Sequence, residues 1–512
     1  MSHPASPAAI KLDGASLTAE QVHCVAVDRS PIELDRDAIA TADRNRAALD
    51  EAIERGDDIY GVTTGLGAFV NRKVAVEDAA ALQRDVLRSH AAGTGELLSA
   101  ECVRAALTVR LNALLAGRSG IRSAVLERVT ELLNRELIPA VPRTGSVGAS
   151  GDLAPSAHAF LPLVGEGALI GVDGEPVDAA DRLREAGLEP LELLPKEALA
   201  LINGTQFMAG IGALAAARAT NLIAAADAIG ALTIEAAEGS SAAYEARVQA
   251  LRPLPGQRAS AAVVRAMTAG SELIDAAGRV QDAYSLRCIP QVHGATREAI
   301  DFFERLISVD LNAVTDNPIV FDDPLEVVSA GNFHGQSLAL AFDALRISLA
   351  SLAAMSERRT FRLLSPTLNG DLPDVLVKWP GRQNGYMVAQ ITAVALVAEL
   401  RSLAGQTSAN SIPTSDNQED HVSLGMTAAL LTLDALERSE AVVAIEALCA
   451  CQALDFRPGN PGAGSAALHA LIRERIPHLD EERSVSAEID AVGRLISTGV
   501  IARVANELEV VS

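Results

Sequence analysis

Apolar residues at helical spacing dominate the chain from about residue 196 onward. Ala and Leu recur there three and four residues apart, which predicts helices that bury one face or all faces. Helices of this length without a heptad seam indicate a large bundle rather than an isolated coiled coil. The predicted helices cover roughly residues 196–238, 258–281, 292–313, 335–364, 385–405 and 420–454.

The pattern is more broken before residue 196. Helical spacing is present in residues 18–55 and 77–90, and residues 99–137 predict two helices separated by Gly117–Gly120. Short strand and turn patterns follow in residues 165–195, and a Pro/Gly-rich loop after residue 456 precedes small helices.

These patterns predict a mainly α protein in three parts. We expect an N-terminal region over residues 1–200, a central long-helix bundle over 201–455 and a small helical segment over 456–512. Aromatic residues are only 3% of the chain, so Ala, Leu, Val and Ile must build the core. Ala and Leu are strong helix formers, which agrees with a bundle.

Charge and cysteine content narrow the possible partners and compartment. The net charge of −23 disfavours nucleic acid and acidic membranes as partners. Five cysteines in a long chain, without repeated spacing, indicate reduced thiols and a cytoplasmic protein. Residues 1–14 lack a signal-peptide pattern, and charged residues interrupt the apolar stretches near 210–236 and 387–403, so we expect bundle helices rather than membrane spans.

The segment Gly148-Ala149-Ser150-Gly151-Asp152 carries candidate chemistry. Glycine permits a compressed turn in which the Gly151 amide nitrogen approaches the Ala149 carbonyl carbon. Cyclisation and loss of two waters, one from the Ser150 side chain, would give a conjugated imidazolone with an exocyclic alkene. Ala-Ser-Gly alone is common by chance in surface loops. A hydrolase serine elbow requires Gly-x-Ser-x-Gly, which Asp152 excludes.

The residues around this tripeptide decide between these possibilities. Gly145–Pro155 closely resembles the signature of the histidine and phenylalanine/tyrosine ammonia-lyases, and further motifs of that family follow in order. They are Tyr60–Gly65, Ser89–Gly93, Leu201–Gln206, Gln281–Cys288, Asp316–Pro318, Gly331–His334 and Asn417–His421.

The resemblance implies a fold, a prosthetic group and an assembly. The fold would be the fumarase/aspartase-like long helical bundle. The prosthetic group would be 4-methylidene-imidazol-5-one (MIO) formed from Ala149-Ser150-Gly151, with no dissociable cofactor and no metal. The family forms homotetramers whose active sites combine residues from three subunits, which suits a long apolar bundle that needs burial.

The resemblance also implies roles for single residues. Arg287 would hold the substrate carboxylate through two parallel hydrogen bonds. Tyr60, on a lid loop, would be the base that removes the β-proton. Asn203 and Tyr284 would hydrogen-bond the imidazolone or the departing amine.

Two further positions would shape the pocket around the prosthetic group. These are Gln281 and Phe333, and ordinary core packing remains an equal interpretation for Phe333.

His90 and Glu419 bear on the choice of substrate, because an imidazole and a carboxylate can bind the ring or the amine of histidine. Ser89-His90, Arg287-Cys288 and Gln418–His421 resemble the histidine branch. We therefore predict conversion of L-histidine to trans-urocanate and ammonia, with capture of the substrate by its amine or by its ring left open.

Other positions favour different substrates. Thr63 and Gly335-Gln336 look more like the phenylalanine/tyrosine branch, and Leu66 stands where histidine lyases usually have Phe. A phenylalanine/tyrosine ammonia-lyase and a tyrosine or phenylalanine 2,3-aminomutase are therefore the alternatives among enzymes. A non-enzymatic scaffold is the alternative from another class.

Overall fold

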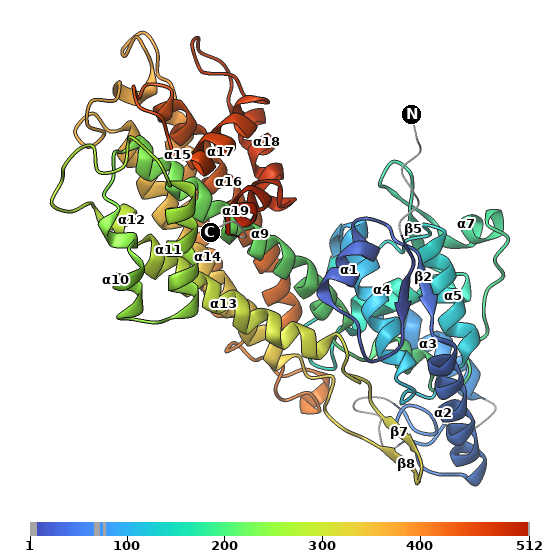
Figure 1. Ribbon diagram of the computed structural model, residues 1–512. Coiled ribbons are helices and arrows are strands. Elements are labelled where there is room, and N and C mark those ends of the chain that lie inside the picture. The colour runs from blue at the N-terminus through green and yellow to red at the C-terminus, as the bar shows by residue number, and fades with distance from the viewer. Residues whose placement is uncertain (1–7, 66–71, 75–77, 510–512) are drawn as a thin grey trace. The chain divides into compact units, whose positions relative to one another are not determined.

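The computed structural model describes residues 8–65, 72–74 and 78–509 and is mainly α-helical (Figure 1). Leu66 and Glu77, the first residue of the helix predicted over 77–90, lie outside the described residues. The chain forms two compact units. Unit 1 contains residues 1–214, 304–342 and 406–430, and unit 2 contains residues 215–303, 343–405 and 431–512. The division into three sequence segments stays a prediction.

Unit 1 begins with short helices. They are α1 (Ala19–Ala26), α2 (Arg36–Arg55), α3 (Ala79–His90), α4 (Ala100–Leu115), α5 (Ser123–Asn134), α6 (Leu153–Phe160), α7 (Ala179–Glu185) and α8 (Glu197–Ile202). Helix α4 is buried along nearly its whole length, because α1, α2 and α5 all pack against it.

Within its described residues, unit 1 also contains four two-stranded sheets. Strands β1 (Ile10–Leu12) and β2 (Ile32–Leu34) pair in parallel, and the other three pairs are antiparallel. Those pairs are β3 (Thr94–Leu97) with β4 (Pro142–Thr144), β5 (Ala168–Ile170) with β6 (Pro176–Asp178), and β7 (Ile319–Asp322) with β8 (Leu325–Val328).

Three helices of unit 1 pack pairwise against one another and position the candidate site. These are α3, α6 and α8. His90 ends α3, Leu153 begins α6 two residues after the Ala149–Gly151 tripeptide, and Asn203 follows the end of α8. The packing of these helices therefore supports three chain segments that carry family motifs.

Long helices build unit 2, and four of them have their other end in unit 1. These four are α9 (Gln206–Ala236), α13 (Ile289–Asp310), α14 (Gln336–Leu364) and α16 (Gly425–Leu454). The remaining helices are α10 (Ala246–Ala250), α11 (Pro255–Met267), α12 (Tyr284–Arg287), α15 (Met387–Leu403), α17 (Ala463–Arg473), α18 (Ser486–Ser497) and α19 (Val500–Glu509).

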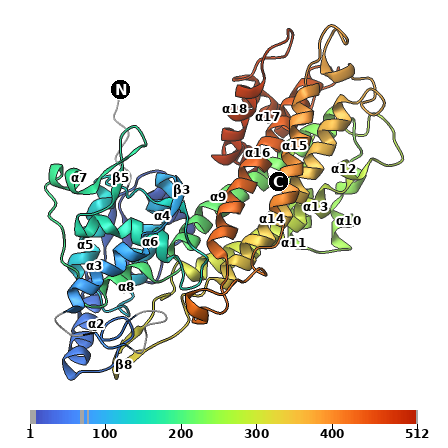
Figure 2. The ribbon, with the colours of Figure 1, turned by 180° about the vertical axis from the view of Figure 1, so that it is seen from behind.

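Figure 2 shows the ribbons of the long helices of unit 2. Buried polar contacts tie these helices together. His293 Nδ1 of α13 lies 2.6 Å from Asp227 Oδ1 of α9, and Arg359 Nε of α14 donates to Glu446 Oε1 of α16 at 2.5 Å. Thr233 of α9 also donates to Glu446, at 2.7 Å. A charged group buried away from water is costly unless it has a partner. These pairs therefore determine which helices pack against one another.

Helices α9 and α14 are long and apolar enough to cross a membrane by length and composition alone. Their most apolar windows are 78% and 61% buried inside the protein, as expected for core helices of a bundle.

Several predicted elements are confirmed. The two helices of residues 99–137 form as α4 and α5, the strand pattern of 165–195 forms β5 and β6, and small helices follow residue 456. The helices predicted over 292–313, 335–364 and 385–405 form within a few residues of those bounds.

Other predicted helices are wrong in extent. The helix of residues 18–55 is interrupted by β2, because Pro31 cannot donate a helical hydrogen bond. The helix of 196–238 breaks between α8 and α9, where Gly204 has φ +146°. The helix of 258–281 ends at Met267, before two glycines with positive φ. The last long helix begins at Gly425 rather than 420, after Leu424 in a left-handed conformation.

Candidate active site

The Ala149–Gly151 tripeptide lies in a tight loop between β4 and α6. Gly148 and Gly151 have φ values of +66° and +72°, a region that side chains with a Cβ disfavour. Ser146 closes the loop, because its Oγ accepts from Gly148 N at 3.1 Å and donates to Gly151 O at 3.2 Å. The loop is therefore tightly turned, while the approach of the Gly151 nitrogen to the Ala149 carbonyl carbon stays a prediction.

A close backbone contact anchors the end of this loop. Gly151 pairs with Gly204 as an isolated parallel bridge, and Asp152 N donates to Gly204 O at 2.7 Å. A Cβ on Gly151 would lie 2.1 Å from Gly204 O, which no side chain can tolerate. Glycine at position 151 thus brings the tripeptide against the segment that carries Asn203.

Asp152 is fully buried directly after the tripeptide. Its Oδ2 accepts from Met208 N, in the first turn of α9, at 2.9 Å. Burial raises the pKa of Asp152 to about 7, since a charged carboxylate loses hydration there. Burial likewise raises the pKa of Asp310 to about 6, although Thr205 Oγ1 donates to it at 2.5 Å.

Glu419 connects the tripeptide to a distant part of the sequence. Ser150 Oγ donates to Glu419 Oε1 at 2.9 Å, and Thr414 Oγ1 donates to Glu419 Oε2 at 2.5 Å. Thr414 and Glu419 also pair through their backbones, with Thr414 N donating to Glu419 O at 3.0 Å. Both oxygens of the carboxylate therefore have fixed partners.

A pocket of about 510 Å³ opens at Ser150, and all of its lining residues belong to unit 1. Polar and apolar side chains share the lining, which is the usual character of a site for a small molecule. The lining residues are Tyr60, Gly65, Leu82, Asp85, Val86, Ser89, His90, Ser150, Leu153, Leu199, Asn203, Ser415 and Glu419.

His90 is half-buried at the end of α3 and lines this pocket. Its Nδ1 lies 2.8 Å from the carbonyl oxygen of Val86. A carbonyl oxygen only accepts, so we assign the proton to Nδ1. In the neutral ring, Nε2 is then an acceptor.

Asn203 is 3% exposed and lines the same pocket. Among the described residues, its side-chain Oδ1 has no hydrogen-bond partner. A buried amide oxygen without a partner is costly, so this atom is available to a group in the pocket.

The residues present fit an MIO group at this loop. Ser150 supplies a hydroxyl, Gly151 has room only for a residue without Cβ, and Asn203 offers an unpaired buried oxygen beside them. Within residues 8–65, 72–74 and 78–509, no group of three or more His, Cys, Asp or Glu could hold a metal ion.

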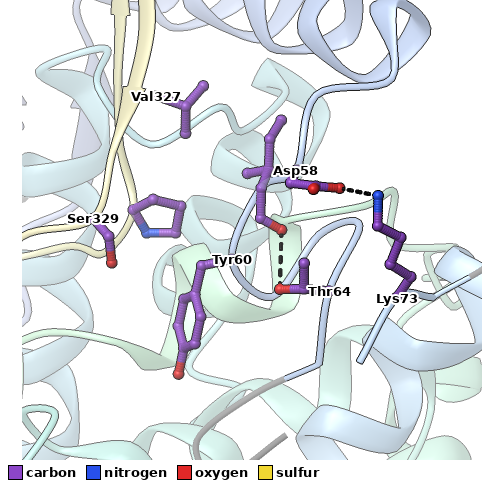
Figure 3. Close-up of a pocket in the computed structure, with 8 residues that line it drawn as sticks. Asp58, Tyr60, Thr64, Lys73, Val327 and Ser329 are labelled. Atoms are coloured by element: carbon purple, nitrogen blue, oxygen red, sulfur yellow. Dashed lines mark hydrogen bonds and ion pairs between the residues drawn. The ribbon is translucent and has the colours of Figure 1, made fainter. Parts of the chain in front are cut away.

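Tyr60 lies between two pockets, because it lines both the Ser150 pocket and a second one of about 360 Å³. Thr63 supports its loop: Thr63 Oγ1 accepts from Ile59 N and donates to Asp57 O, both at 2.8 Å. Figure 3 shows the Tyr60 ring directed away from the ion pair between Asp58 and Lys73, whose Oδ1 and Nζ are 2.8 Å apart. Tyr60 therefore lines the Ser150 pocket, whereas Asp58 and Lys73 do not.

Three predicted site residues belong to unit 2, whereas Ser150 belongs to unit 1. These are Gln281, Tyr284 and Arg287. Tyr284 is 71% exposed, and the Arg287 guanidinium lies over its ring at 4.7 Å. Arg287 Nε donates to Asp282 O at 2.9 Å. None of the three lines the Ser150 pocket of the same chain.

Phe333 belongs to unit 1 and is half-buried, but it does not line the Ser150 pocket either. The structure therefore brings together Tyr60, His90, Ser150, Asn203 and Glu419 in one chain.

Thr414 and two pocket-lining residues of α3, Leu82 and Val86, were not predicted from the sequence. Leu82, Val86 and Ser89 recur at helical spacing and together line the pocket, so the amphipathic pattern of α3 was a usable signal. Thr414 offered no such signal. Its role depends on a turn in which Ser415, Asp416 and Asn417 all have left-handed φ values, which no periodicity reveals.

Comparisons with known proteins agree with this fold and site. The family model for aromatic amino acid lyases matches residues 17–474. A histidine ammonia-lyase from Anaeromyxobacter dehalogenans (strain 2CP-C) is 46% identical, over 96% of this chain and 99% of its own.

Two solved structures share the whole fold. Tyrosine aminomutase from Streptomyces globisporus is 36% identical with a TM-score of 0.92, over 98% of both chains. Histidine ammonia-lyase from Trypanosoma cruzi is 37% identical with a TM-score of 0.91, over 98% of this chain and 95% of its own. The fold and family place the protein among the carbon–nitrogen lyases. The chain belongs to the aromatic amino acid lyase family.

Proposed function

We propose that this enzyme eliminates ammonia from L-histidine and releases trans-urocanate, the first step of histidine catabolism, with an MIO group formed from Ala149-Ser150-Gly151. One observation carries the proposal: Ser150 lies in a pocket with both His90 and Glu419 and hydrogen-bonds the latter at 2.9 Å. Those two side chains suit an imidazole and an amine. The 46% identity to a histidine ammonia-lyase supports the same substrate.

The MIO group would supply an electrophilic carbon that no standard side chain offers. The protein must then orient the substrate and move one proton. Tyr60 would remove the β-proton, as a tyrosine can when its surroundings lower its pKa. Asn203 would offer its unpaired Oδ1 to the amine, while His90 and Glu419 hold the imidazole or the amine.

Carboxylate binding would come from Arg287, with Tyr284 and Gln281 beside it. Because these residues lie in the other compact unit, we propose that they complete the Ser150 pocket of another subunit in a homotetramer. Phe333 would shape the same composite site. Helix α15 supports assembly, since Met387, Val388, Ile391 and Val394 are 41–61% exposed at helical spacing. An apolar face of this kind favours a protein partner.

We further propose that the enzyme is soluble and cytoplasmic and that it has no nucleic-acid or membrane partner. All five cysteines are free thiols, as expected in a reducing compartment. The net charge of −23 suits solubility and repels nucleic acid and acidic lipid.

A panel of L-histidine, L-tyrosine and L-phenylalanine tests the substrate through the absorbance of each product. We expect urocanate from histidine and little cinnamate or coumarate from the others. Cinnamate or coumarate without urocanate would replace the proposal by a phenylalanine/tyrosine ammonia-lyase. A β-amino acid without net ammonia would indicate an aminomutase, as the name of the Streptomyces globisporus tyrosine aminomutase implies for that enzyme.

Intact mass tests the prosthetic group independently of any substrate. Loss of two waters lowers the mass of the chain by about 36 Da relative to its sequence. An unmodified mass together with no product from any amino acid would favour a non-enzymatic scaffold.

A further inference from the structure

A carboxylate contacts the oxygen atom that must leave when the MIO group forms. Ser150 Oγ lies 2.9 Å from Glu419 Oε1, although the two residues are 269 positions apart in the chain. Glu419 is half-buried in the pocket, so the contact is partly shielded from water. Shielding strengthens a hydrogen bond and favours proton transfer along it.

Loss of the Ser150 hydroxyl needs two proton movements. Hydroxide is a poor leaving group, so an acid must protonate Oγ as the Cβ–O bond breaks. The α-proton of Ser150 must also be accepted by a base, and it is acidic because its carbon lies beside a carbonyl. A single carboxyl group can perform both tasks when it lies against the hydroxyl.

We propose that Glu419 is the acid–base catalyst that dehydrates Ser150, before the same side chain meets any substrate. The Glu419 carboxylate, which accepts from Ser150 Oγ, takes the α-proton of Ser150, and the electrons of the Cα–H bond form the Cα=Cβ double bond. Glu419 passes that proton to Oγ as the Cβ–O bond breaks, and water leaves with the bonding electron pair. Glu419 ends as the carboxylate with which it began. This inference rests on the proposal that Ala149–Gly151 forms the prosthetic group.

Thr414 positions Glu419 for this step. Its hydroxyl holds Oε2 at 2.5 Å, and the backbone pairing of Thr414 with Glu419 closes the turn of residues 415–417. With Oε2 fixed, Oε1 is the oxygen directed at Ser150. Once the Ser150 hydroxyl has gone, Oε1 loses its partner and faces the pocket, where a substrate can use it.

The other carboxyl group near the loop has different partners. Asp152 Oδ1 accepts from Ser146 Oγ at 3.4 Å, and Asp152 Oδ2 accepts from Met208 N at 2.9 Å. The hydroxyl of Ser150 donates to Glu419 instead. The geometry therefore assigns the dehydration to Glu419 and a structural role to Asp152.

The test measures the mass of the tryptic peptide Thr144–Arg182 by mass spectrometry. This peptide contains Ser150 but none of the substituted positions. The variants are Glu419→Gln, Glu419→Ala, Thr414→Val and the conservative Thr414→Ser, each purified without substrate. His90→Ala is the control, because His90 lines the same pocket while its ring bonds Val86 O rather than the Ser150 hydroxyl. Circular dichroism confirms that each variant is folded.

We expect the peptide from both Glu419 variants to be at least about 18 Da heavier than that of the wild type, because the Ser150 water is retained. Thr414→Val should leave a mixture of hydrated and dehydrated peptide, while Thr414→Ser and His90→Ala should match the wild type. Full dehydration in folded Glu419→Ala would overturn the role of Glu419. A wild-type peptide of unmodified mass would overturn the prosthetic group itself, so the two failures are distinguishable.

Discussion

At the scale of single residues, burial sets the ionisation of Asp152. The pKa of this fully buried carboxyl is raised from 3.8 to about 7, because the charged form loses hydration that its hydrogen bonds do not replace. Its folded pKa is above its unfolded value, so the native state binds more protons between the two values. The stabilisation is present below the unfolded pKa and is lost as the pH rises through about 7.

This argument predicts that Asp152→Asn weakens the pH dependence of stability. The wild type should melt at a higher temperature near pH 6 than near pH 8, and the variant should show a smaller difference. Asp310, with a pKa of about 6, retains part of the effect. Differential scanning calorimetry measures the melting temperatures of the wild type and of Asp152→Asn at both pH values.

Asp35→Asn serves as the control for this prediction, because Asp35 is only partly buried and its hydrogen bond with Lys11 lowers its pKa. It should change the melting temperature equally at both pH values. An Asp152→Asn protein with the full wild-type pH difference would contradict the assignment.

At the scale of elements, the short helix α12 depends on a neighbouring tyrosine. Tyr244 is 3% exposed, and its hydroxyl donates to Leu286 O at 2.6 Å. Arg287 is the last residue of α12, next to that carbonyl group. The contact therefore holds the segment that presents both Tyr284 and Arg287.

Tyr244→Phe removes a buried hydrogen bond to Leu286 O, which then accepts only from Cys288 N. We expect a loss of about 0.5–1.5 kcal/mol in the free energy of unfolding. We also expect a higher KM for histidine with a smaller change in kcat, because Arg287 would bind the carboxylate less well. Urea denaturation and steady-state kinetics measure the two effects.

Tyr386→Phe is a matched control, since Tyr386 is also buried but its hydroxyl has no hydrogen-bond partner among the described residues. Its free energy of unfolding should be unchanged or slightly higher. Equal destabilisation of both variants would show that the Tyr244 bond has no special role.

The sequence predicted elements well where periodicity alone decides them and poorly where single residues decide them. The long helices α13, α14 and α15 follow from apolar spacing over many turns. The break before α9 depends instead on Gly204, whose backbone meets Gly151 from a distant segment. The same reason explains why Thr414 was missed: its partner Glu419 lies across a left-handed turn.

At the scale of the whole molecule, the family motifs predict more site residues than line the Ser150 pocket of one chain. Tyr60, His90, Asn203 and Glu419 line that pocket, and their roles in catalysis and binding stay predictions. Gln281, Tyr284 and Arg287 lie in the other compact unit, and their convergence on Ser150 stays a prediction. Sequence periodicity cannot place residues across subunits, since it reports only which faces are buried.

The exposed apolar face of α15 allows a test of whether the protein assembles into an oligomer. Val388 and Ile391 are 61% and 56% exposed, and a pair of Asp substitutions there would oppose burial of this apolar face. The variant Val388→Asp/Ile391→Asp should sediment as a smaller species and lose most of its activity, while remaining helical. Val172→Asp, at a lone exposed valine outside the helices, should change neither property. A fully active tetramer with both α15 substitutions would exclude this face from the interface.

The rate of urocanate formation from L-histidine by Ser150→Ala tests the central claim most directly. Alanine fits the half-buried position but has no hydroxyl to lose, so no alkene can form. We predict a fall of more than about a thousandfold in kcat relative to the wild type, because an essential covalent catalyst is absent. Deamination of histidine by Ser150→Ala at the wild-type rate would contradict the account.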